Sequence, residues 1–215
     1  MSDRNIKLLL SRLIGLMPTN KVRCFLYRTL LNYKIYQSYI GRGTILAVDH
    51  AELTECAIGV KNNFVGPMRI TIMKGASIGP MNDFYCGEWV KEERFKSENY
   101  DSCLYIGINT LITSNHFFDV AGSFSLGNYS WVAGKSSQFW THGAGVKDRN
   151  INIGEHCYIG SAVRFAPGSL VGDNCIVGLG SIATKKITTK NAIIAGNPAK
   201  VIRENYDWKT KKNIG

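Results

Sequence analysis

Apolar residues recur every six positions through the last third of the chain. The recurring positions are Ile153, Ile159, Phe165, Val171, Val177 and Ala183. A period of six fits neither the 3.6-residue turn of an α-helix nor the two-residue alternation of a strand, so it indicates a repeat architecture. We predict a parallel β-helix, an all-β fold in which each hexad supplies one short strand and one corner, and three hexads close a triangular coil.

Glycine directly follows four of these apolar positions. These glycines are Gly154, Gly160, Gly172 and Gly178. We expect glycine there because it permits corner dihedrals that a β-carbon opposes. The same six-residue beat can be followed back to Ile40, but residues 82–102 and 141–152 lack it. We interpret these two stretches as excursion loops, and we note that Gln138 falls where the beat requires an aliphatic residue.

The segment before the repeat differs in kind. Residues 3–36 show an apolar helical stripe that stops at Pro18 and resumes after Thr19 or Asn20, which can cap a second helix. The first 48 residues carry eight Lys or Arg and a single acid, Asp3. Two interpretations stay open: residues 1–36 contact an anionic membrane surface, or they form a lid on the open end of the repeat, which has to be covered.

The domain organisation follows from these patterns. We expect an N-terminal amphipathic, basic helical segment (1–39), a β-helix domain (40–203) and a basic C-terminal tail (204–215). Nucleic-acid binding is disfavoured, although the net charge is +10, because the excess charge lies on helices with an apolar stripe.

Cysteine spacing and the absence of a leader bear on the compartment. The six cysteines form no CxxC pair, and Cys157 and Cys175 lie three hexads apart, so we expect them to stack in successive coils as free thiols. We find no signal peptide and no apolar run of the ~18 residues needed to span a bilayer. A reducing cytoplasmic location is therefore expected, with a peripheral position on the inner face of the membrane left open.

The regular part of the repeat resembles a known family. The stretch Ile153-Gly-Glu-His-Cys-Tyr-Ile-Gly-Ser161 and the ending Ala195-Gly-Asn-Pro-Ala-Lys-Val-Ile-Arg203 are similar to those of hexapeptide-repeat acyltransferases. The likeness is closest to the maltose, galactoside and xenobiotic acetyltransferase branch, and within it to polysaccharide O-acetyltransferases. It implies a left-handed parallel β-helix, a homotrimer with active sites between subunits, and acetyl-CoA as co-substrate without a metal.

The resemblance also implies a function and a catalytic residue. It predicts transfer of an acetyl group to a hydroxyl of a nucleotide- or lipid-linked saccharide in capsule, O-antigen or exopolysaccharide synthesis. The family's catalytic histidine corresponds to His142, at the mouth of the second excursion. An imidazole titrates near neutral pH, so it can take the proton of a hydroxyl that attacks a thioester. The residue that orients this ring is left open, since Asp148 and Glu155 are merely nearby in sequence.

Coenzyme A contacts follow residue by residue from the same likeness. They are Ser161, Leu179, Thr184, Lys185, Lys200 and Arg203. The two residues nearest the C-terminus would meet phosphate groups, a lysine as a point charge and an arginine as a fork. The prolines that usually follow this coil in the family are replaced here by Ile187-Thr-Thr-Lys190.

Acceptor contacts are harder to assign. Asp83 and Trp89, in the first excursion, and His116 are the candidate acceptor-binding residues, and for His116 core packing is the competing interpretation. Alternatives to the saccharide O-acetyltransferase are an acetyltransferase for small molecules or amino sugars, and a non-catalytic β-helix scaffold at a membrane surface. A γ-type carbonic anhydrase is disfavoured because its zinc needs three histidines that meet, and His116, His142 and His156 do not have stacked spacing.

Overall fold

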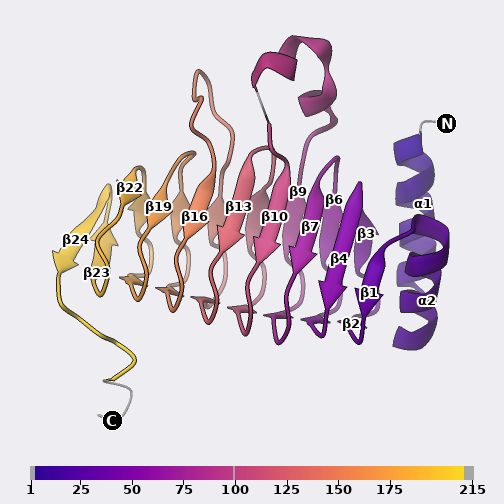
Figure 1. Ribbon diagram of the computed structural model, residues 1–215, viewed down its shortest axis with the longest axis horizontal. Coiled ribbons are helices and arrows are strands. Elements are labelled where there is room, and N and C mark those ends of the chain that lie inside the picture. The colour runs from indigo at the N-terminus through magenta and orange to yellow at the C-terminus, as the bar shows by residue number, and fades with distance from the viewer. Residues whose placement is uncertain (1–2, 99, 211–215) are drawn as a thin grey trace.

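The computed structural model describes residues 3–98 and 100–210, and in them the strands form three parallel sheets wound into a triangular prism (Figure 1). We name the sheets A, B and C in the order in which the chain visits them. Each turn of the chain adds one strand to each sheet, and each strand pairs in parallel with the equivalent strand of the next coil. The predicted parallel β-helix is therefore confirmed.

The strands of the three sheets alternate along the chain. Sheet A contains β1 (Lys34–Tyr36), β4 (His50–Thr54), β7 (Arg69–Ile72), β10 (Cys103–Ile106), β13 (Ser123–Leu126), β16 (Ile151–Ile153), β19 (Leu170–Val171) and β22 (Lys186–Ile187). Sheet B contains β2 (Tyr39–Ile40), β5 (Ala57–Ile58), β8 (Ser77–Ile78), β11 (Leu111–Ile112), β14 (Trp131–Val132), β17 (Tyr158–Ile159), β20 (Ile176–Val177), β23 (Ile193–Gly196) and the antiparallel β24 (Ala199–Arg203). Sheet C contains β3 (Ile45–Ala47), β6 (Asn63–Val65), β9 (Asp83–Tyr85), β12 (Phe117–Asp119), β15 (Gln138–Phe139), β18 (Arg164–Phe165) and β21 (Ile182–Ala183).

A ladder of phenylalanines fills the prism behind sheet C. The rings of Phe84 and Phe118 stack at 4.5 Å between centroids, and those of Phe118 and Phe139 stack at the same distance. The inward residue of β15 is therefore Phe139 rather than Gln138, which faces outward. The expectation of an aliphatic residue at position 138 was wrong because the beat takes a seven-residue step after Val132, its preceding inward position.

The glycines after the inward residues serve a different purpose from the one expected. Gly154, Gly160 and Gly172 do not have positive φ. A β-carbon on Gly160 would instead lie 2.7 Å from the backbone nitrogen of Leu179 in the next coil. These glycines therefore allow close stacking of neighbouring coils, since real β-carbons do not come so near to backbone atoms.

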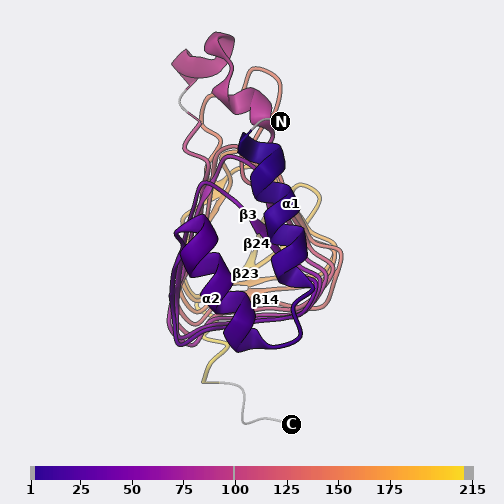
Figure 2. The ribbon, with the colours of Figure 1, turned by 90° about the vertical axis from the view of Figure 1, so that its right-hand side faces the viewer.

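Two helices lie across the open N-terminal end of the prism (Figure 2). They are α1 (Asp3–Gly15) and α2 (Asn20–Leu31), and the Thr19 side chain caps α2 by accepting from the Val22 amide. The buried Arg23 donates to the carbonyl of Ile40 at 2.8 Å, which ties α2 to the first coil. The helices thus cap the repeat. The first strand already begins at Lys34, inside the segment expected to be helical.

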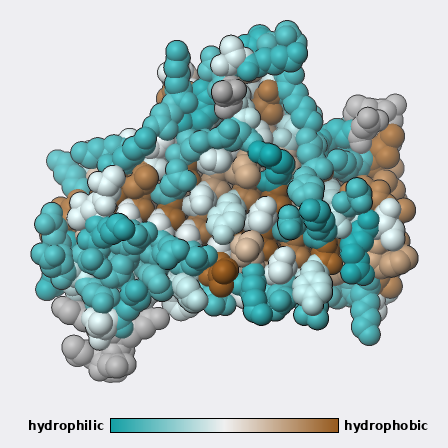
Figure 3. Space-filling model, viewed as in Figure 1, coloured by the Kyte–Doolittle hydropathy of each residue, from teal (hydrophilic) through white to brown (hydrophobic). Residues whose placement is uncertain are grey.

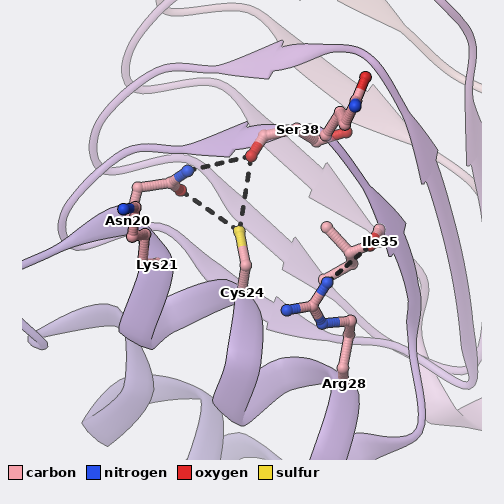
Figure 4. Close-up of a pocket in the computed structure, with 7 residues that line it drawn as sticks. Asn20, Lys21, Cys24, Arg28, Ile35 and Ser38 are labelled. Atoms are coloured by element: carbon pink, nitrogen blue, oxygen red, sulfur yellow. Dashed lines mark hydrogen bonds between the residues drawn. The ribbon is translucent and has the colours of Figure 1, made fainter.

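Polar contacts hold α2 against the first coil around a pocket of about 320 Å³ (Figure 4). Asn20 donates to the carbonyl of Ser38, and the thiol of Cys24 donates to the side chain of Asn20. Arg28 donates to the carbonyl of Ile35 at 3.3 Å. Burial raises the pKa of the Cys24 thiol, so this cysteine is a packed, protonated side chain.

Both excursions leave the prism at the corner where sheet C passes to sheet A, at the top of Figure 1. The first contains the short 3₁₀ helices η1 (Glu88–Lys91) and η2 (Glu93–Glu98). The second is the irregular segment 141–150 between β15 and β16. At the C-terminal end, Trp208 donates to the carbonyl of His156 at 2.9 Å, so part of the expected tail packs on the prism. Residues 211–215 of that tail, like Met1 and Ser2, lie outside the described residues.

Candidate active site

The catalytic candidate His142 is paired with a buried carboxylate from the preceding coil. Its Nδ1 lies 2.9 Å from Oδ2 of Asp119, the last residue of β12. The side chain of Asp119 is 3% exposed and that of His142 is 41% exposed. The carboxylate of the pair therefore lies in the interior, and one edge of the imidazole ring faces solvent.

Thr141 fixes the carboxylate in turn. The backbone amide of Thr141 donates to Asp119 Oδ2 at 2.8 Å, and the hydroxyl of Thr141 lies 2.8 Å from the same oxygen. The hydroxyl also accepts from the amide of Gly122 at 2.9 Å. Because the carboxylate has several partners, it holds one orientation and directs the imidazole attached to it.

This arrangement determines the tautomer of His142. A carboxylate accepts and cannot donate, so the hydrogen between Asp119 and His142 belongs to Nδ1. The neutral ring then carries its lone pair on Nε2, the nitrogen that does not contact Asp119. His142 is thus arranged as a base whose conjugate acid would be stabilised by the adjacent carboxylate.

Two tryptophans wall the imidazole. The ring of Trp89 in η1 meets that of His142 edge to face, with centroids 5.4 Å apart. Trp140 lies 6.3 Å away in a similar orientation. Gly87 makes room for the Trp89 indole, since a β-carbon there would clash with the indole nitrogen. Trp89, Asp119 and His142 come from three successive coils, so the fold rather than the local sequence brings them together.

Arg149 fastens the two excursions to each other. Its guanidinium lies 4.0 Å from the ring centroid of Tyr100 and 3.0 Å from a carboxylate oxygen of Glu98, and Arg149 is 4% exposed. Tyr100 in turn packs against Trp89 at 5.0 Å. The wall formed by Trp89 is therefore braced by the same loop that carries His142.

Two of the predicted coenzyme A contacts line one cavity. Lys185 and Lys200 border a cavity of about 360 Å³ together with Lys186 and residues 187–189. Lys185 lies at the sheet C to sheet A corner, two coils beyond His142, or about 10 Å at the usual strand spacing, and the rest of the lining comes from β22, the residues after it and β24. A salt bridge of 2.6 Å between Lys186 and Asp148 links this corner to the His142 loop.

The other predicted coenzyme A contacts are spread more widely. Ser161 and Leu179 lie one above the other at the corner between sheets B and C, and Leu179 is 80% exposed. Thr184 is exposed beside Lys185. Arg203 instead packs its guanidinium over Tyr206 at 4.9 Å. In one chain Ser161 and Leu179 therefore lie at one edge of sheet C and Thr184 and Lys185 at the other, whereas Arg203 lies in β24 of sheet B.

His116 is 2% exposed and lies at the sheet B to sheet C corner, beneath a hollow of about 320 Å³, rather than beside His142. Its Nε2 is 2.9 Å from the hydroxyl of Thr113, and its Nδ1 accepts from the amide of Ser137 at 3.1 Å. Burial lowers the pKa of His116 to about 4, which keeps the ring neutral. These contacts favour the core-packing interpretation over acceptor binding. His116, His142 and His156 occupy three different corners of the prism.

Asp119 is the side chain beside His142 that sequence reasoning missed. Asp148 and Glu155, the carboxylates nearest in sequence, bind Lys186 and Asn128 instead. The coil period could have indicated Asp119. It follows the inward Phe118 at the sheet C to sheet A corner, and His142 lies at the same corner one coil later. Among the described residues, no group of three His, Cys, Asp or Glu side chains is placed to hold a metal ion.

Comparison with known proteins places this site in context. No family model matches the chain. A segment of 57 residues is 49% identical to the galactoside O-acetyltransferase of Escherichia coli K12, covering 26% of this chain and 28% of that protein. A segment of 96 residues is 34% identical to an E. coli protein named as a colanic acid biosynthesis acetyltransferase, WcaF, covering 40% of this chain and 50% of that protein. The matches thus span half or less of these relatives.

The fold is shared with solved acetyltransferases over most of the chain. The crystal structure of the polySia-specific acetyltransferase NeuO superposes with a TM-score of 0.55 at 20% identity, covering 82% of this chain and 83% of that one. The protein is a left-handed parallel β-helix of the hexapeptide-repeat type. In sequence it is similar to proteins named as acetyltransferases over 26% to 40% of the chain.

Proposed function

We propose that the protein transfers an acetyl group from acetyl-CoA to a hydroxyl of a saccharide that belongs to a surface polysaccharide or its precursor. The observation that carries this proposal is the Asp119–His142 pair, at the corner where both excursions leave the prism. The relatives named as galactoside and colanic acid biosynthesis acetyltransferases support the reaction class and the kind of acceptor.

The proposed reaction is a direct transfer in a ternary complex. Nε2 of His142 takes the proton of the acceptor hydroxyl while its oxygen attacks the thioester carbonyl carbon. The tetrahedral intermediate collapses with cleavage of the C–S bond, and Nε2 returns the proton to the departing thiolate to give free coenzyme A and an acetyl ester. Asp119 stabilises the imidazolium in between, and a positioned base of this kind contributes about 10²–10⁴-fold to the rate.

The basic cavity near the C-terminal coils would hold the phosphate groups of acetyl-CoA. Lys185 and Lys200 border it, and neither has an acidic partner among the ion pairs of the described residues. Lysine ammonium groups suit phosphates as point charges. Ser161 and Leu179, at the far edge of sheet C, would contact the pantetheine arm bound to a neighbouring subunit.

A homotrimer is proposed because one chain leaves apolar side chains exposed beside these contacts. Leu179 is 80% exposed and Trp131, on the outer face of sheet B, is 39% exposed. Burying such groups against a second copy is favourable at about 25 cal/mol per Å² of apolar surface. Sedimentation velocity tests this assembly, and a monomer at micromolar concentration would contradict it.

On the acceptor side, Trp89 offers an indole beside the imidazole and Asp83 offers a carboxylate on the outer face of sheet C. Sugar rings carry apolar faces that pack on aromatic rings, and their hydroxyls donate to carboxylates. Both residues are therefore proposed acceptor contacts.

The capping helices add a proposed membrane contact. Their outer faces expose large apolar side chains, among them Leu13 and Phe25 at 51% and 56%, and the end of the molecule where they lie is largely brown in Figure 3. Lys21 and Arg28 are exposed beside them. An anionic membrane surface suits such a face. Within the described residues, no helix has the length and apolarity required to cross a bilayer.

The decisive test of the function compares His142→Ala with His50→Ala, which removes a partly exposed histidine at the start of β4, four coils before His142. Incubation with acetyl-CoA and a set of saccharides should show acetylation that His142→Ala lowers by about 10²–10⁴-fold and His50→Ala leaves unchanged. Equal turnover by both variants would refute the mechanism. A chain that acetyl-CoA does not stabilise in thermal unfolding would instead favour the non-catalytic scaffold.

A further inference from the structure

We infer that the outer face of sheet C carries a binding groove for a saccharide chain several residues long, which extends from α1 to His142. This inference rests on the proposed function and adds to it the length of the acceptor. Its first observation is a trough of about 330 Å³ whose floor is formed by outward side chains of β3, β6, β9 and β12. Leu8 and Arg12, one turn apart on α1, form one wall of this trough.

The trough continues toward the catalytic histidine. Phe117 lines the trough, and its ring lies 4.8 Å from that of Trp140, which in turn packs beside His142. A second hollow of about 320 Å³ shares Asp83 and Phe117 with the trough and widens the groove toward the opposite corner, between sheets B and C. The floor from β3 to β15 crosses four strand spacings, or about 19 Å. A ligand that contacts both Arg12 and His142 is therefore several times as long as one pyranose ring.

The side chains of the groove suit a saccharide. Tyr85 is 49% exposed and Phe117 is partly exposed, so both offer ring faces on which a sugar can pack. Asp83 accepts from the amide group of Asn63 at 2.7 Å and keeps its remaining lone pairs for hydroxyl donors. The guanidinium of Arg12 is exposed and is a donor for hydroxyl oxygens or for a sugar carboxylate.

Other occupants fit this groove less well. A peptide strand cannot add to its floor, since β9 is already paired on one side with β6 and on the other with β12. An acyl chain would remove water from Arg12 and Asp83 without replacing their hydrogen bonds, which is costly. A saccharide supplies apolar ring faces that can pack on Tyr85 and Phe117, and hydroxyl groups that can hydrogen-bond with Asp83 and Arg12.

The test measures how binding depends on the number of sugar units. Sialic acid and glucose oligomers of one, three and six units are titrated by calorimetry into the full chain without acetyl-CoA, and each oligomer is also offered as acceptor with it. We expect the six-unit oligomer of one series to bind at least tenfold more tightly than its single unit. Arg12→Ala and Tyr85→Ala should each lower this ratio about fivefold or more.

Matched controls separate the groove from general surface effects. Arg69→Ala removes an exposed arginine from sheet A, and Tyr39→Ala removes a tyrosine of the same exposure, 49%, from sheet B. Both should leave the ratio unchanged. His142→Ala should abolish acetyl transfer but keep length-dependent binding, so the groove can be tested even if the proposed reaction is wrong.

Three results would overturn the inference. The first is binding or acetylation that is independent of oligomer length, and the second is the absence of binding by every oligomer in both series. The third is a change of oligomeric state in Tyr85→Ala without a change in binding, because a second copy of the chain would then cover the groove.

Discussion

Replacing Asp119 with asparagine tests the catalytic pair with little change in shape. The amide of Thr141 and Nδ1 of His142 both donate to the same carboxylate oxygen, at 2.8 and 2.9 Å, so the side-chain oxygen of asparagine takes that position and keeps both hydrogen bonds. The tautomer of His142 is then unchanged, but the negative charge beside the ring is lost. The imidazolium that forms during transfer is no longer stabilised by a carboxylate.

The contribution of a general base bounds the size of the effect, since the base itself remains. A loss of about 10²-fold in kcat is expected, the lower end of the range for a general base, which equals about 3 kcal/mol of transition-state stabilisation. The KM for acetyl-CoA and the melting temperature should change little, because no buried donor loses its partner. Asp119→Ala differs, since it leaves the Thr141 amide unpaired and costs about 1–3 kcal/mol of folding free energy.

Steady-state rates of acetyl-ester formation across pH 5–9 measure this prediction. Asp148→Asn and Glu155→Gln are the controls, because these carboxylates are the nearest to His142 in sequence and bind other partners. A kcat of Asp119→Asn within threefold of the wild-type value at every pH would refute the reasoning, and so would equal losses in the two controls.

Three further predictions follow from other parts of the molecule. Since burial holds the pKa of His116 at about 4 in the folded state, below its unfolded value, stability is full above about pH 6.5 and falls toward pH 4. Chemical denaturation should therefore show that, between pH 7 and pH 4, the free energy of unfolding falls by about 3 kcal/mol more for the wild type than for His116→Asn. Equal decreases would contradict this. Lys200→Ala should raise the KM for acetyl-CoA about fivefold but leave the KM for 3′-dephospho-acetyl-CoA unchanged. A rise in both values would show that Lys200 does not contact the 3′-phosphate. Arg149→Met should lower kcat/KM for the acceptor about tenfold and speed proteolysis within 141–150, because the brace between the excursions is lost; unchanged proteolysis would show that the brace is dispensable.

The parts of the fold that repeat could be predicted from the sequence. The spacing from Ile153 onward determined the coil, and the eighteen residues between Cys157 and Cys175 correctly placed both as buried free thiols in neighbouring coils. The prediction from this spacing failed where the step between inward residues changed. At Gln138, a step of seven residues instead of six shifts the inward position by one. Local rules cannot detect that shift, since the side chain that points inward is selected by stacking on the coils above and below.

The site could be predicted only in part, for a related reason. His142 was predicted through the family resemblance, which places a histidine before this regular segment, and it stays a prediction. The neighbouring Asp119 was not predicted, because the search for a partner of His142 followed sequence distance. In a β-helix the nearest neighbours of a corner residue are one coil away, 23 residues in this case. Corner residues should therefore be compared at the period of the coil when partners are sought.

The position of the two excursions shows how this fold separates chemistry from recognition. Trp89 and His142 follow β9 and β15 at one corner of the prism. Asp119 ends β12 at the same corner, on the coil between the two long excursions. Adding residues at a corner leaves the pairing of the strands intact, and the entropic cost of a longer loop grows only with the logarithm of its length. The proposed base and its carboxylate can therefore stay on consecutive, rigidly paired coils while the loops on either side set the walls that an acceptor meets. Because Arg149 joins those loops, a change in one wall is transmitted to the loop that bears His142, so the two excursions are best altered together when acceptor preference is changed.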